Sequence, residues 1–323
     1  MKLASLINGE KDGRLIVVSR DLTRAVKADA ATTLLSAIEL WDKVADALAA
    51  QAQKLENGNA EGAFGFDKKD TQAPLARAPQ WLDASAFKTH SDLVAKAWNN
   101  KNRWSDTTPL MYQGASDDLL PSYGPSYLPS ESHDMDFEGE VVVVVDTVPM
   151  GISAEHALSH IKLVGIANDV SLRAFGAAEQ EAGFGFLRAK PSTIFSPVFV
   201  TLDELNDNWR DGKLHGALSV HVNDRWVGSP RTEYMNFSFG QLIAHAATSR
   251  KLSAGTILGS GTVSDPLDDT GSASLLEVRA VEQLKHGECR TPFLQFGDTV
   301  KIDVTDQDQH SIFGVIEHQV LKG

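Results

Sequence analysis

The chain has 323 residues, of which 42% are hydrophobic and 23% are charged, and its formal net charge is −13. This length suits one large domain or two unequal ones, and the composition is that of a globular protein with a sizeable core. The acidic balance disfavours general nucleic-acid binding, which needs a basic face. The single cysteine, Cys289, excludes an internal disulfide, and we interpret it as a structural thiol rather than a nucleophile.

The first residues, MKLASLINGEKDGRL, become polar after Ile7 and lack the apolar stretch of a signal peptide. No apolar run approaches the roughly 20 residues that span a bilayer. We therefore expect a cytoplasmic protein that binds neither membranes nor nucleic acids.

Residues 1–20 predict two short strands, KLASLI and RLIVVS, around the turn NGEKDG. Residues 30–56 predict one long helix, because apolar side chains such as Leu34 and Ile38 recur there at helical spacing. The polar stretch that follows, up to about residue 73, is typical of a linker.

We therefore expect a small N-terminal α+β domain over residues 1–72 and a second, larger domain over residues 73–323. Strands and loops dominate the second part, so the predicted fold class is α+β with a mainly β second domain.

Five consecutive valines, residues 141–145, predict a strand that is buried on both faces. Ser153 is a suitable N-cap for a helix through AEHALSHIKL, and LVGIANDVSLR returns as strand and loop. SVHVNDRWVG predicts a hairpin that turns at Asn223 and Asp224, and FGQLIAHAAT predicts a short helix. The segment TVKIDVTDQDQHSIFGVIEHQV predicts a closing hairpin.

Three carboxylates, Asp136, Glu138 and Glu140, alternate with other residues directly before the valines. Residues two apart on a strand point to the same face, roughly 7 Å apart, so these carboxylates would share one face. A desolvated cluster of this kind raises the pKa values of its members, and a divalent cation removes the penalty. Oxygen ligands favour Mg²⁺, Ca²⁺ or Mn²⁺ over zinc. The competing interpretation is a solvated strand end whose acidic residues face water.

Other segments continue the pattern. WLDASAFKTH places Asp83 seven residues before His90, and IANDVSLR places Asp169 four residues before Arg173. Together with PLMYQG, DFEGEV, AKPSTIFSP, GTILGSGTVS, and ASLLEV followed by TPFLQFGDTVKIDV, these segments resemble the fumarylacetoacetate hydrolase family. The resemblance extends from about residue 73 to the C-terminus.

The resemblance implies a divalent cation, with Mg²⁺ as first choice and Ca²⁺ or Mn²⁺ as alternatives. The implied ligands are Asp83, Glu138, Glu140 and Asp169. It also implies His90 as the general base, oriented by Glu277 of an apolar SLLEV strand. The implied substrate contacts are Tyr112, Arg173 and Lys190, of which the two cations would also act at the reacting oxygens. The implied fold is a mixed β-roll catalytic domain behind a small N-terminal α+β domain, assembled as a homodimer.

The implied reaction is hydrolysis of a carbon–carbon bond in a β-diketone. A base must take a proton from the attacking water, and imidazole titrates near neutral pH. A hard cation that chelates the diketone oxygens would stabilise the carbanion that leaves. The leading hypothesis is cleavage of fumarylacetoacetate, a dicarboxylic keto acid, to fumarate and acetoacetate in aromatic amino-acid (tyrosine) breakdown.

Alternatives on the same scaffold are acylpyruvate (fumarylpyruvate) hydrolysis, oxaloacetate decarboxylation, and hydration or isomerisation of a dicarboxylic acid. A metal-stabilised binding domain without catalysis is an alternative of another class.

The substrate contacts depart from the family pattern, whereas the metal ligands do not. Ser85, Asn99 and Gly176 replace a tyrosine, an arginine and a glutamine of the eukaryotic fumarylacetoacetases. The candidate substitutes for these contacts are Lys88, Gln180 and Arg188.

Several residues have a structural interpretation as well. Arg173 could merely neutralise a carboxylate, and Tyr112 could belong to the core with a satisfied hydroxyl. His156 and His160 are one helical turn apart, but without a third ligand a solvated helix face is the better interpretation. GFGFLR lacks the third glycine of a dinucleotide-binding GxGxxG, and the GSG at 259–261 is not a GxSxG nucleophile elbow.

Overall fold

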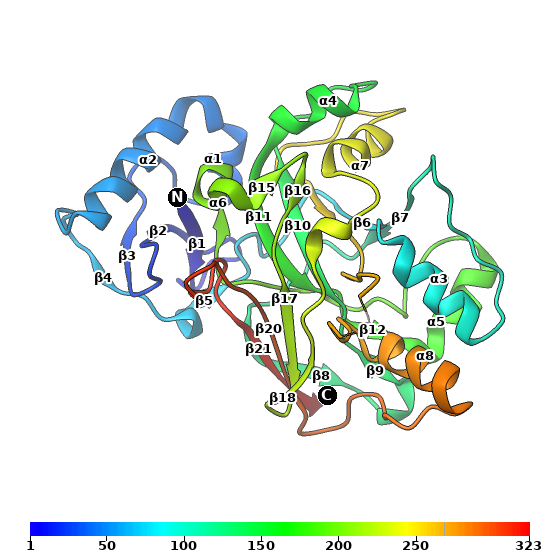
Figure 1. Cartoon of the computed structure of the whole chain (residues 1–323). Coiled ribbons are helices and arrows are strands. Elements are labelled where there is room, and N and C mark those ends of the chain that lie inside the picture. Colours follow the sequence, from blue (N-terminus) through cyan, green and yellow to red (C-terminus); the bar gives the residue numbers. More distant parts are fainter. Residues whose placement is uncertain (268) are drawn as a thin grey trace.

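A mixed α+β architecture with two main sheets is seen in the computed structural model, which describes residues 1–267 and 269–323 (Figure 1). Within these residues the larger sheet has twelve strands, and its path runs β4-β3-β2-β1-β14-β11-β10-β19-β6-β7. Two further strands pair beside this path, β5 with β1 and β13 with β11. The N-terminal strands are β1 (Lys2–Leu6), β2 (Arg14–Val18), β3 (Arg24–Lys27), β4 (Phe64–Gly65) and β5 (Thr71–Gln72). The others are β6 (Trp81–Ser85), β7 (Leu110–Gly114), β10 (Gly139–Val145), β11 (Ile161–Asn168), β13 (Ile194–Phe195), β14 (Phe199–Val200) and β19 (Ile257–Gly259).

The second sheet has the order β18-β17-β20-β21-β8. Its strands are β8 (Tyr123–Leu128), β17 (Leu218–Val222), β18 (Arg225–Gly228), β20 (Thr299–Val304) and β21 (Ile316–Lys322). Two small ribbons pair β9 (Met135–Asp136) with β12 (Ser171–Leu172), and β15 (Trp209–Arg210) with β16 (Lys213–Leu214).

The helices gather in separate groups around the sheets (Figure 1). α1 and α2 lie beside the N-terminal strands, and α3, α5 and α8 lie on the opposite side of the molecule. The helices are α1 (Leu34–Glu39), α2 (Trp41–Glu56), α3 (Lys88–Ala97), α4 (Ala154–Ala157), α5 (Arg173–Ala182), α6 (Leu202–Leu205), α7 (Phe239–Ala246) and α8 (Leu275–His286). In the described part of the chain, none of them combines the length and the apolar character that a membrane crossing requires.

The valine run of β10 lies between two hydrophobic cores, as its sequence predicts. Val141, Val143 and Val145 belong to one buried cluster, and Val142 and Val144 belong to another. Successive side chains on a strand point to opposite faces, so a strand with a core on each side needs apolar residues at every position. β10 is therefore a central strand, and its N-terminal end brings Glu140 to the sheet.

Several other predictions about local structure are confirmed. β1 and β2 pair as antiparallel strands, and β20 pairs with β21. The β17–β18 hairpin turns at Asn223 and Asp224, whose φ values of 51° and 60° suit a two-residue hairpin turn. α7 begins after Ser238, whose side chain accepts a hydrogen bond from the Gln241 N–H in a capping box.

Three predictions about the boundaries of elements are wrong. The helix expected over residues 30–56 is two helices, because Leu40 leaves the helical conformation between α1 and α2. The expected linker contains β4 and β5, and β5 pairs with β1. The helix expected after Ser153 ends early, because Ile161 already begins β11 and pairs with β10. Tertiary strand pairing overrides the local helical pattern there.

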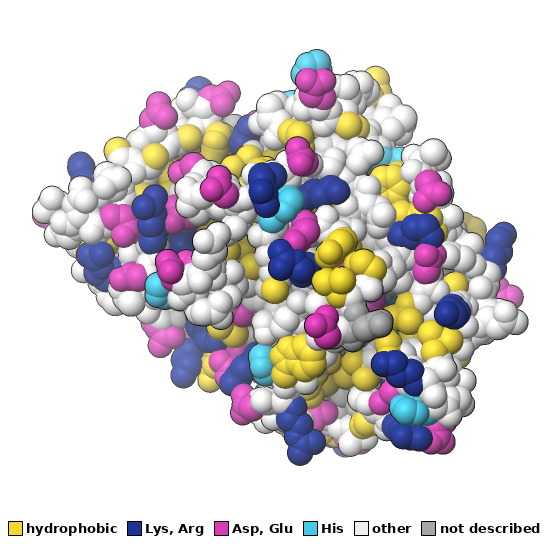
Figure 2. Space-filling model, viewed as in Figure 1, with side chains coloured by type: hydrophobic (Ala, Val, Ile, Leu, Met, Phe, Trp, Pro, Cys, Tyr) yellow, Lys and Arg dark blue, Asp and Glu magenta, His cyan; other side chains and the backbone are white. Residues whose placement is uncertain are grey.

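The N-terminal strands belong to the same larger sheet as the later strands, because β1 pairs with β14 through Lys2 and Val200. The domain division at residue 72 stays a prediction. On the face shown in Figure 2, basic and acidic side chains are interspersed among apolar patches. The acidic excess is therefore not concentrated in one region of that face.

Candidate active site

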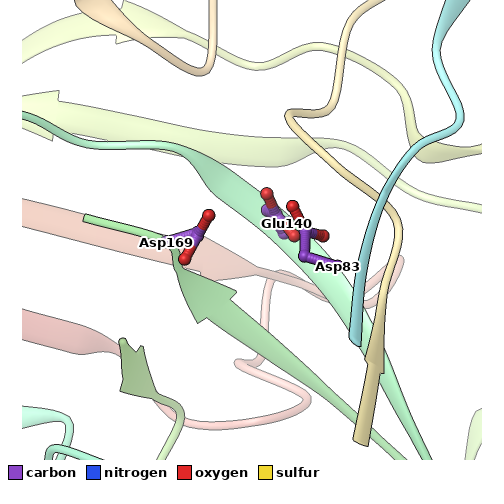
Figure 3. Close-up of side chains that lie close together, drawn as sticks. All are labelled: Asp83, Glu140 and Asp169. Carbon is purple, nitrogen blue, oxygen red and sulfur yellow. The ribbon is translucent and has the colours of Figure 1, made fainter. Parts of the chain in front are cut away.

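Three carboxylates converge at the ends of neighbouring strands. Asp83 lies on β6, Glu140 is the second residue of β10, and Asp169 directly follows β11. One potential ligand atom from each of them lies within 4.8 Å of the other two, and all three residues are buried. Figure 3 shows the three side chains turned toward one another. The sheet order β11-β10-β19-β6 brings them together from positions far apart in the sequence.

Glycine at position 259 makes room for this cluster. β19 runs beside β6 with Gly259 opposite Asp83. A Cβ at this position would lie 2.4 Å from Asp83 Oδ1 and 2.8 Å from Glu140 Oε2. Gly261 has a φ of 77°, which favours glycine, and its N–H donates to Asp83 Oδ1 at 3.2 Å. The glycines of GTILGSGT therefore shape the backbone around the carboxylates.

The cluster fits a hard divalent cation. Both carboxylate oxygens of Glu140 are buried and have no hydrogen-bond partner among the described residues. Burial and the neighbouring Asp169 raise the pKa of Asp83 to about 8, and burial together with Asp83 raises the pKa of Glu140 well above its usual range. A bound cation would remove this penalty by supplying the missing charge. Buried oxygen donors without another partner suit Mg²⁺, Ca²⁺ or Mn²⁺.

Glu138 lies next to the three carboxylates but is held by cations of the protein. Its Oε1 accepts from Arg173 at 2.6 Å, and its Oε2 accepts from Lys190 Nζ at 2.6 Å. Burial works to raise the pKa of Glu138, but Lys190 and Arg173 outweigh it and hold the pKa well below its usual value. Glu138 is not a member of the three-carboxylate group, so its assignment as a metal ligand stays a prediction.

Lys190 connects Glu138 to the cluster. Its ammonium donates to Asp169 Oδ2 at 2.5 Å as well as to Glu138. The same Asp169 oxygen accepts from the Tyr112 hydroxyl at 2.5 Å, and Asp169 Oδ1 accepts from Thr193 at 2.9 Å. Tyr112 therefore has a satisfied hydroxyl that faces the candidate metal site. Thr193 was not predicted as a site residue, because a lone threonine in a loop carries no sequence signal.

The expectation that Asp136 shares a strand face with Glu138 and Glu140 is wrong. The strand is interrupted between β9 and β10, and Asp136 points toward α8 instead. Its carboxylate accepts from the N–H groups of Leu275 and Leu276 at 2.8 and 3.0 Å. It also accepts two hydrogen bonds from Arg173. Asp136 therefore joins Arg173 to the N-terminus of α8.

Glu277 lies on α8, so the prediction of a strand at SLLEV is wrong. Ser274 caps this helix by accepting from the Glu277 N–H at 3.2 Å. The predicted pairing nevertheless is present in the geometry, because His90 Nδ1 lies 2.9 Å from Glu277 Oε1. His90 is on α3, which packs against α8. The SLLEV segment forms the first turn of a helix, but its apolar residues are also compatible with a strand. The pattern of apolar residues alone cannot distinguish the two.

Several of these residues border a cleft with a volume of about 370 Å³. Its lining includes His90, Tyr112, Glu138, Arg173 and Lys190 near the cluster. This size is within the usual range of small-molecule sites.

Two of the three positions that depart from the family pattern, Ser85 and Gly176, line the same cleft. The candidate substitute Gln180 lines it as well. The other candidate substitutes are engaged elsewhere, because Lys88 pairs with Asp92 and Arg188 pairs with Glu179.

Two histidines expected on a solvated helix face differ from each other. His160 ends the turn after α4, and its Nδ1 lies 2.5 Å from Asp146 Oδ1. His156 contacts Ser153 near the start of α4. The expectation of a purely solvated pair is therefore wrong for His160, which contacts Asp146.

The sequence profile described as "Fumarylacetoacetate (FAA) hydrolase C-terminal" matches residues 79–321. The chain belongs to the fumarylacetoacetate hydrolase family. The profile described as "Fumarylacetoacetase N-terminal domain 2" matches residues 1–77. The family and the α+β fold with an N-terminal domain, both predicted from the sequence, are thereby confirmed.

Relatives of the chain have different activities. An oxaloacetate tautomerase of Xenopus laevis is 27% identical over 157 residues, which are 48% of this chain and 47% of that protein. A fumarylacetoacetase of Caenorhabditis elegans is 26% identical over 253 residues, which are 69% of this chain and 57% of that protein. The chain thus spans about half the length of these curated relatives.

The fold is also found in a solved structure. The maleylpyruvate hydrolase of Sphingobium sp. SYK-6, crystallised with manganese(II) and pyruvate, aligns over 100% of both chains with a TM-score of 0.66 at 16% identity. At this identity the likeness shows the shared fold. Family enzymes include hydrolases, isomerases and tautomerases, so the choice among reactions depends on the site itself.

Proposed function

We propose that the chain is a metal-dependent hydrolase that cleaves a carbon–carbon bond in a β-diketone acid. Fumarylacetoacetate, cleaved to fumarate and acetoacetate, is the leading substrate, which would place the protein in tyrosine catabolism. The observation that carries this proposal is the contact of His90 with Glu277, 2.9 Å apart, on the cleft that Asp83 also lines. Relatives that act on keto acids, and the manganese of the Sphingobium hydrolase, support it.

The metal would be held by Asp83, Glu140 and Asp169, with Glu138 beside them. Mg²⁺ is the first choice, with Mn²⁺ or Ca²⁺ as alternatives. A cation held by these residues would supply Lewis-acid chemistry, which stabilises negative charge on ketone oxygens.

His90 would act as the general base. The Glu277 carboxylate accepts the Nδ1 hydrogen, which leaves Nε2 free to take a proton from water. The water oxygen bonds to the carbonyl carbon, and the carbon–carbon bond breaks with its electron pair on the leaving fragment. The proton held by His90 then passes to that fragment, which gives two carboxylic-acid products from one diketone and one water.

Lys190 would stabilise charge on the attacked carbonyl oxygen. An ammonium group has three N–H donors, and Glu138 and Asp169 accept two of them. The third is available to a substrate oxygen in the cleft that Lys190 lines. Arg173 would act on the substrate mainly by holding Glu138 and Asp136, because its contacts are with those two carboxylates.

Replacement of His90 tests the proposal. His90→Ala should lower kcat for fumarylacetoacetate by about 10²- to 10⁴-fold, the usual contribution of a general base. Binding of Mn²⁺, measured by calorimetry, should be unchanged, because His90 is not one of the three clustered carboxylates. Unchanged turnover in this variant would refute the role of His90 as the base.

An oxaloacetate reaction is the second candidate, because the Xenopus relative is an oxaloacetate tautomerase. Parallel assays with fumarylacetoacetate, fumarylpyruvate and oxaloacetate, each monitored by its ultraviolet absorbance, distinguish the two. We also propose a cytoplasmic homodimer, as the family resemblance implies. Light scattering coupled to gel filtration measures this state, and a monomeric mass would exclude the dimer.

A further inference from the structure

Four lysine and arginine side chains line the cleft, and they form two groups. Arg173 and Lys190 each contact two carboxylates at the inner end. Lys101 and Arg103 follow α3 at the outer wall, and neither forms an ion pair with any residue that the structure describes. The outer cations therefore have charge to offer a ligand, whereas the inner cations are neutralised by the protein.

The segment that carries Arg103 is attached on both sides. Asn102 donates to Asp92 of α3 at 2.6 Å. The ring of Trp104 packs on Phe237, with 5.3 Å between the ring centroids. Arg103 is thus presented from a short anchored turn, which reduces the entropy lost when it binds a ligand.

Arg103 reaches across the cleft to α5. Its Nη1 donates to the backbone oxygen of Gln180 at 3.2 Å, the one hydrogen bond found for its guanidinium in the described part of the chain. A guanidinium has five N–H donors, and a carboxylate can accept two of them side by side. The remaining donors are therefore sufficient for a bidentate contact with a carboxylate.

The wall of α5 opposite Arg103 has small side chains. Gly176 and Ala177 precede Gln180 by about one turn, so the three share one helical face. A Cβ at Gly176 would meet no atom within 4 Å, which shows open space beside it. The cleft therefore has room for a ligand group between this face and Arg103.

We propose that Arg103, assisted by Lys101, binds a second carboxylate of the substrate, at the end away from the acidic cluster. This inference rests on the proposed function and makes it more specific. The outer wall carries the two cations that form no ion pair in the described part of the chain, so it attracts a second negative charge. The enzyme would accordingly prefer dicarboxylic over monocarboxylic diketones. Arg103 would determine specificity and would take no part in the proton transfer.

A pair of substrates tests the assignment. Fumarylpyruvate has two carboxylates, whereas acetylpyruvate has one and the same diketone. In Arg103→Gln, KM for fumarylpyruvate should rise about 10- to 100-fold, the effect of losing a hydrogen bond to a charged group. kcat/KM for acetylpyruvate should change less than about 2-fold, because acetylpyruvate has no second carboxylate for Arg103 to bind. Lys101→Gln should give a smaller effect with the same selectivity.

Arg225→Gln is the matched control, because Arg225 lies on β18 and does not line the cleft. It should leave both substrates unaffected. Equal losses for both substrates in Arg103→Gln, or no loss for either, would overturn the proposed subsite.

A binding measurement keeps this test independent of the reaction. Calorimetry with fumarate and with crotonate, its monocarboxylic counterpart, compares the Mn²⁺-loaded wild type with Arg103→Gln. Fumarate should bind about 10-fold more weakly to the variant, and crotonate should bind equally to both proteins. If no diketone is turned over but this difference is found, the proposed reaction is wrong and the carboxylate subsite stands. If fumarate binds both proteins alike, the subsite is wrong.

Discussion

The inner and outer ends of the cleft are built differently. Asp83, Glu140 and Asp169 are buried and come from neighbouring strands of the central sheet. The outer end is formed by α5 and the segment after α3, where Lys101 and Arg103 are exposed. A rigid sheet can hold charged groups in a costly arrangement, whereas loops and helix ends tolerate changes in sequence. The comparison fits our proposal that reaction chemistry belongs to the inner end and substrate choice to the outer end.

The largest expected effect comes from adding one methyl group beside the three clustered carboxylates of the inner end. In Gly259→Ala the new Cβ would lie 2.4 Å from Asp83 Oδ1, so the carboxylates must move apart. We expect Mn²⁺ affinity, measured by calorimetry, to fall by about 10- to 100-fold or more, and activity to fall with it. Gly65→Ala is the control, because a Cβ there would meet nothing within 4 Å.

Asp83→Asn provides a second test of the same end, because it removes a charge without adding volume. It should weaken Mn²⁺ binding while circular dichroism stays that of the wild type. Wild-type Mn²⁺ affinity in both variants would show that the buried carboxylates hold no metal.

The contrast between the two ends also explains what the sequence could predict. The family resemblance predicts Asp83, Glu140 and Asp169 together as metal ligands, because the segments around Asp83 and Asp169 carry no signal of their own. The pairing of His90 with Glu277 was likewise predicted, although the strand at SLLEV was wrong. Capping by Ser274 starts a helix there, and the apolar residues of SLLEV are equally compatible with a strand.

Other contacts could not be predicted from the sequence, because they depend on tertiary distance. Asp136 was grouped with Glu138 by strand alternation, but the break between β9 and β10 turns it toward α8. Arg103 gives no motif, and only the packing of the segment after α3 beside α5 brings it to the cleft. A contact between two elements that are far apart in the sequence leaves no periodic pattern in the sequence of either element.

The next largest expected effect is on the stability of the protein. It depends on pH through a buried histidine that is linked to Glu138 by hydrogen bonds. Burial lowers the pKa of His318 to about 4 from 6.5. Its Nε2 lies 2.8 Å from the amide nitrogen of Asn168, whose oxygen accepts from the Glu138 N–H. The unfolded chain binds a proton more readily than the folded one between these two pKa values. Stability therefore falls as the pH drops below 6.5, by about 2 kcal/mol at pH 5.

Urea unfolding at pH 7.5 and at pH 5 measures this loss. His318→Gln keeps a hydrogen-bond acceptor for Asn168 but cannot take up the proton. Between pH 7.5 and pH 5, the free energy of unfolding of the wild type should decrease by about 2 kcal/mol more than that of this variant. His310→Gln, at an exposed position, is the control. Equal pH dependence in wild type and His318→Gln would contradict the role of this buried imidazole.

The smallest expected effect is at the outer end, where aromatic contact attaches residues 183–188 to the cleft. Phe186 packs edge-to-face on Tyr112, with ring centroids 5.1 Å apart, whereas Phe184 is fully exposed. An aromatic pair of this kind contributes about 0.5–1.5 kcal/mol, so Phe186→Ala should raise KM by about 2- to 10-fold with kcat nearly unchanged. Phe184→Ala, in the same segment, should change neither constant. A large drop in kcat for Phe186→Ala would place this residue with the reacting groups. The proposed division of the cleft, with chemistry at the inner end and substrate choice at the outer end, would then fail at the position where the two ends meet.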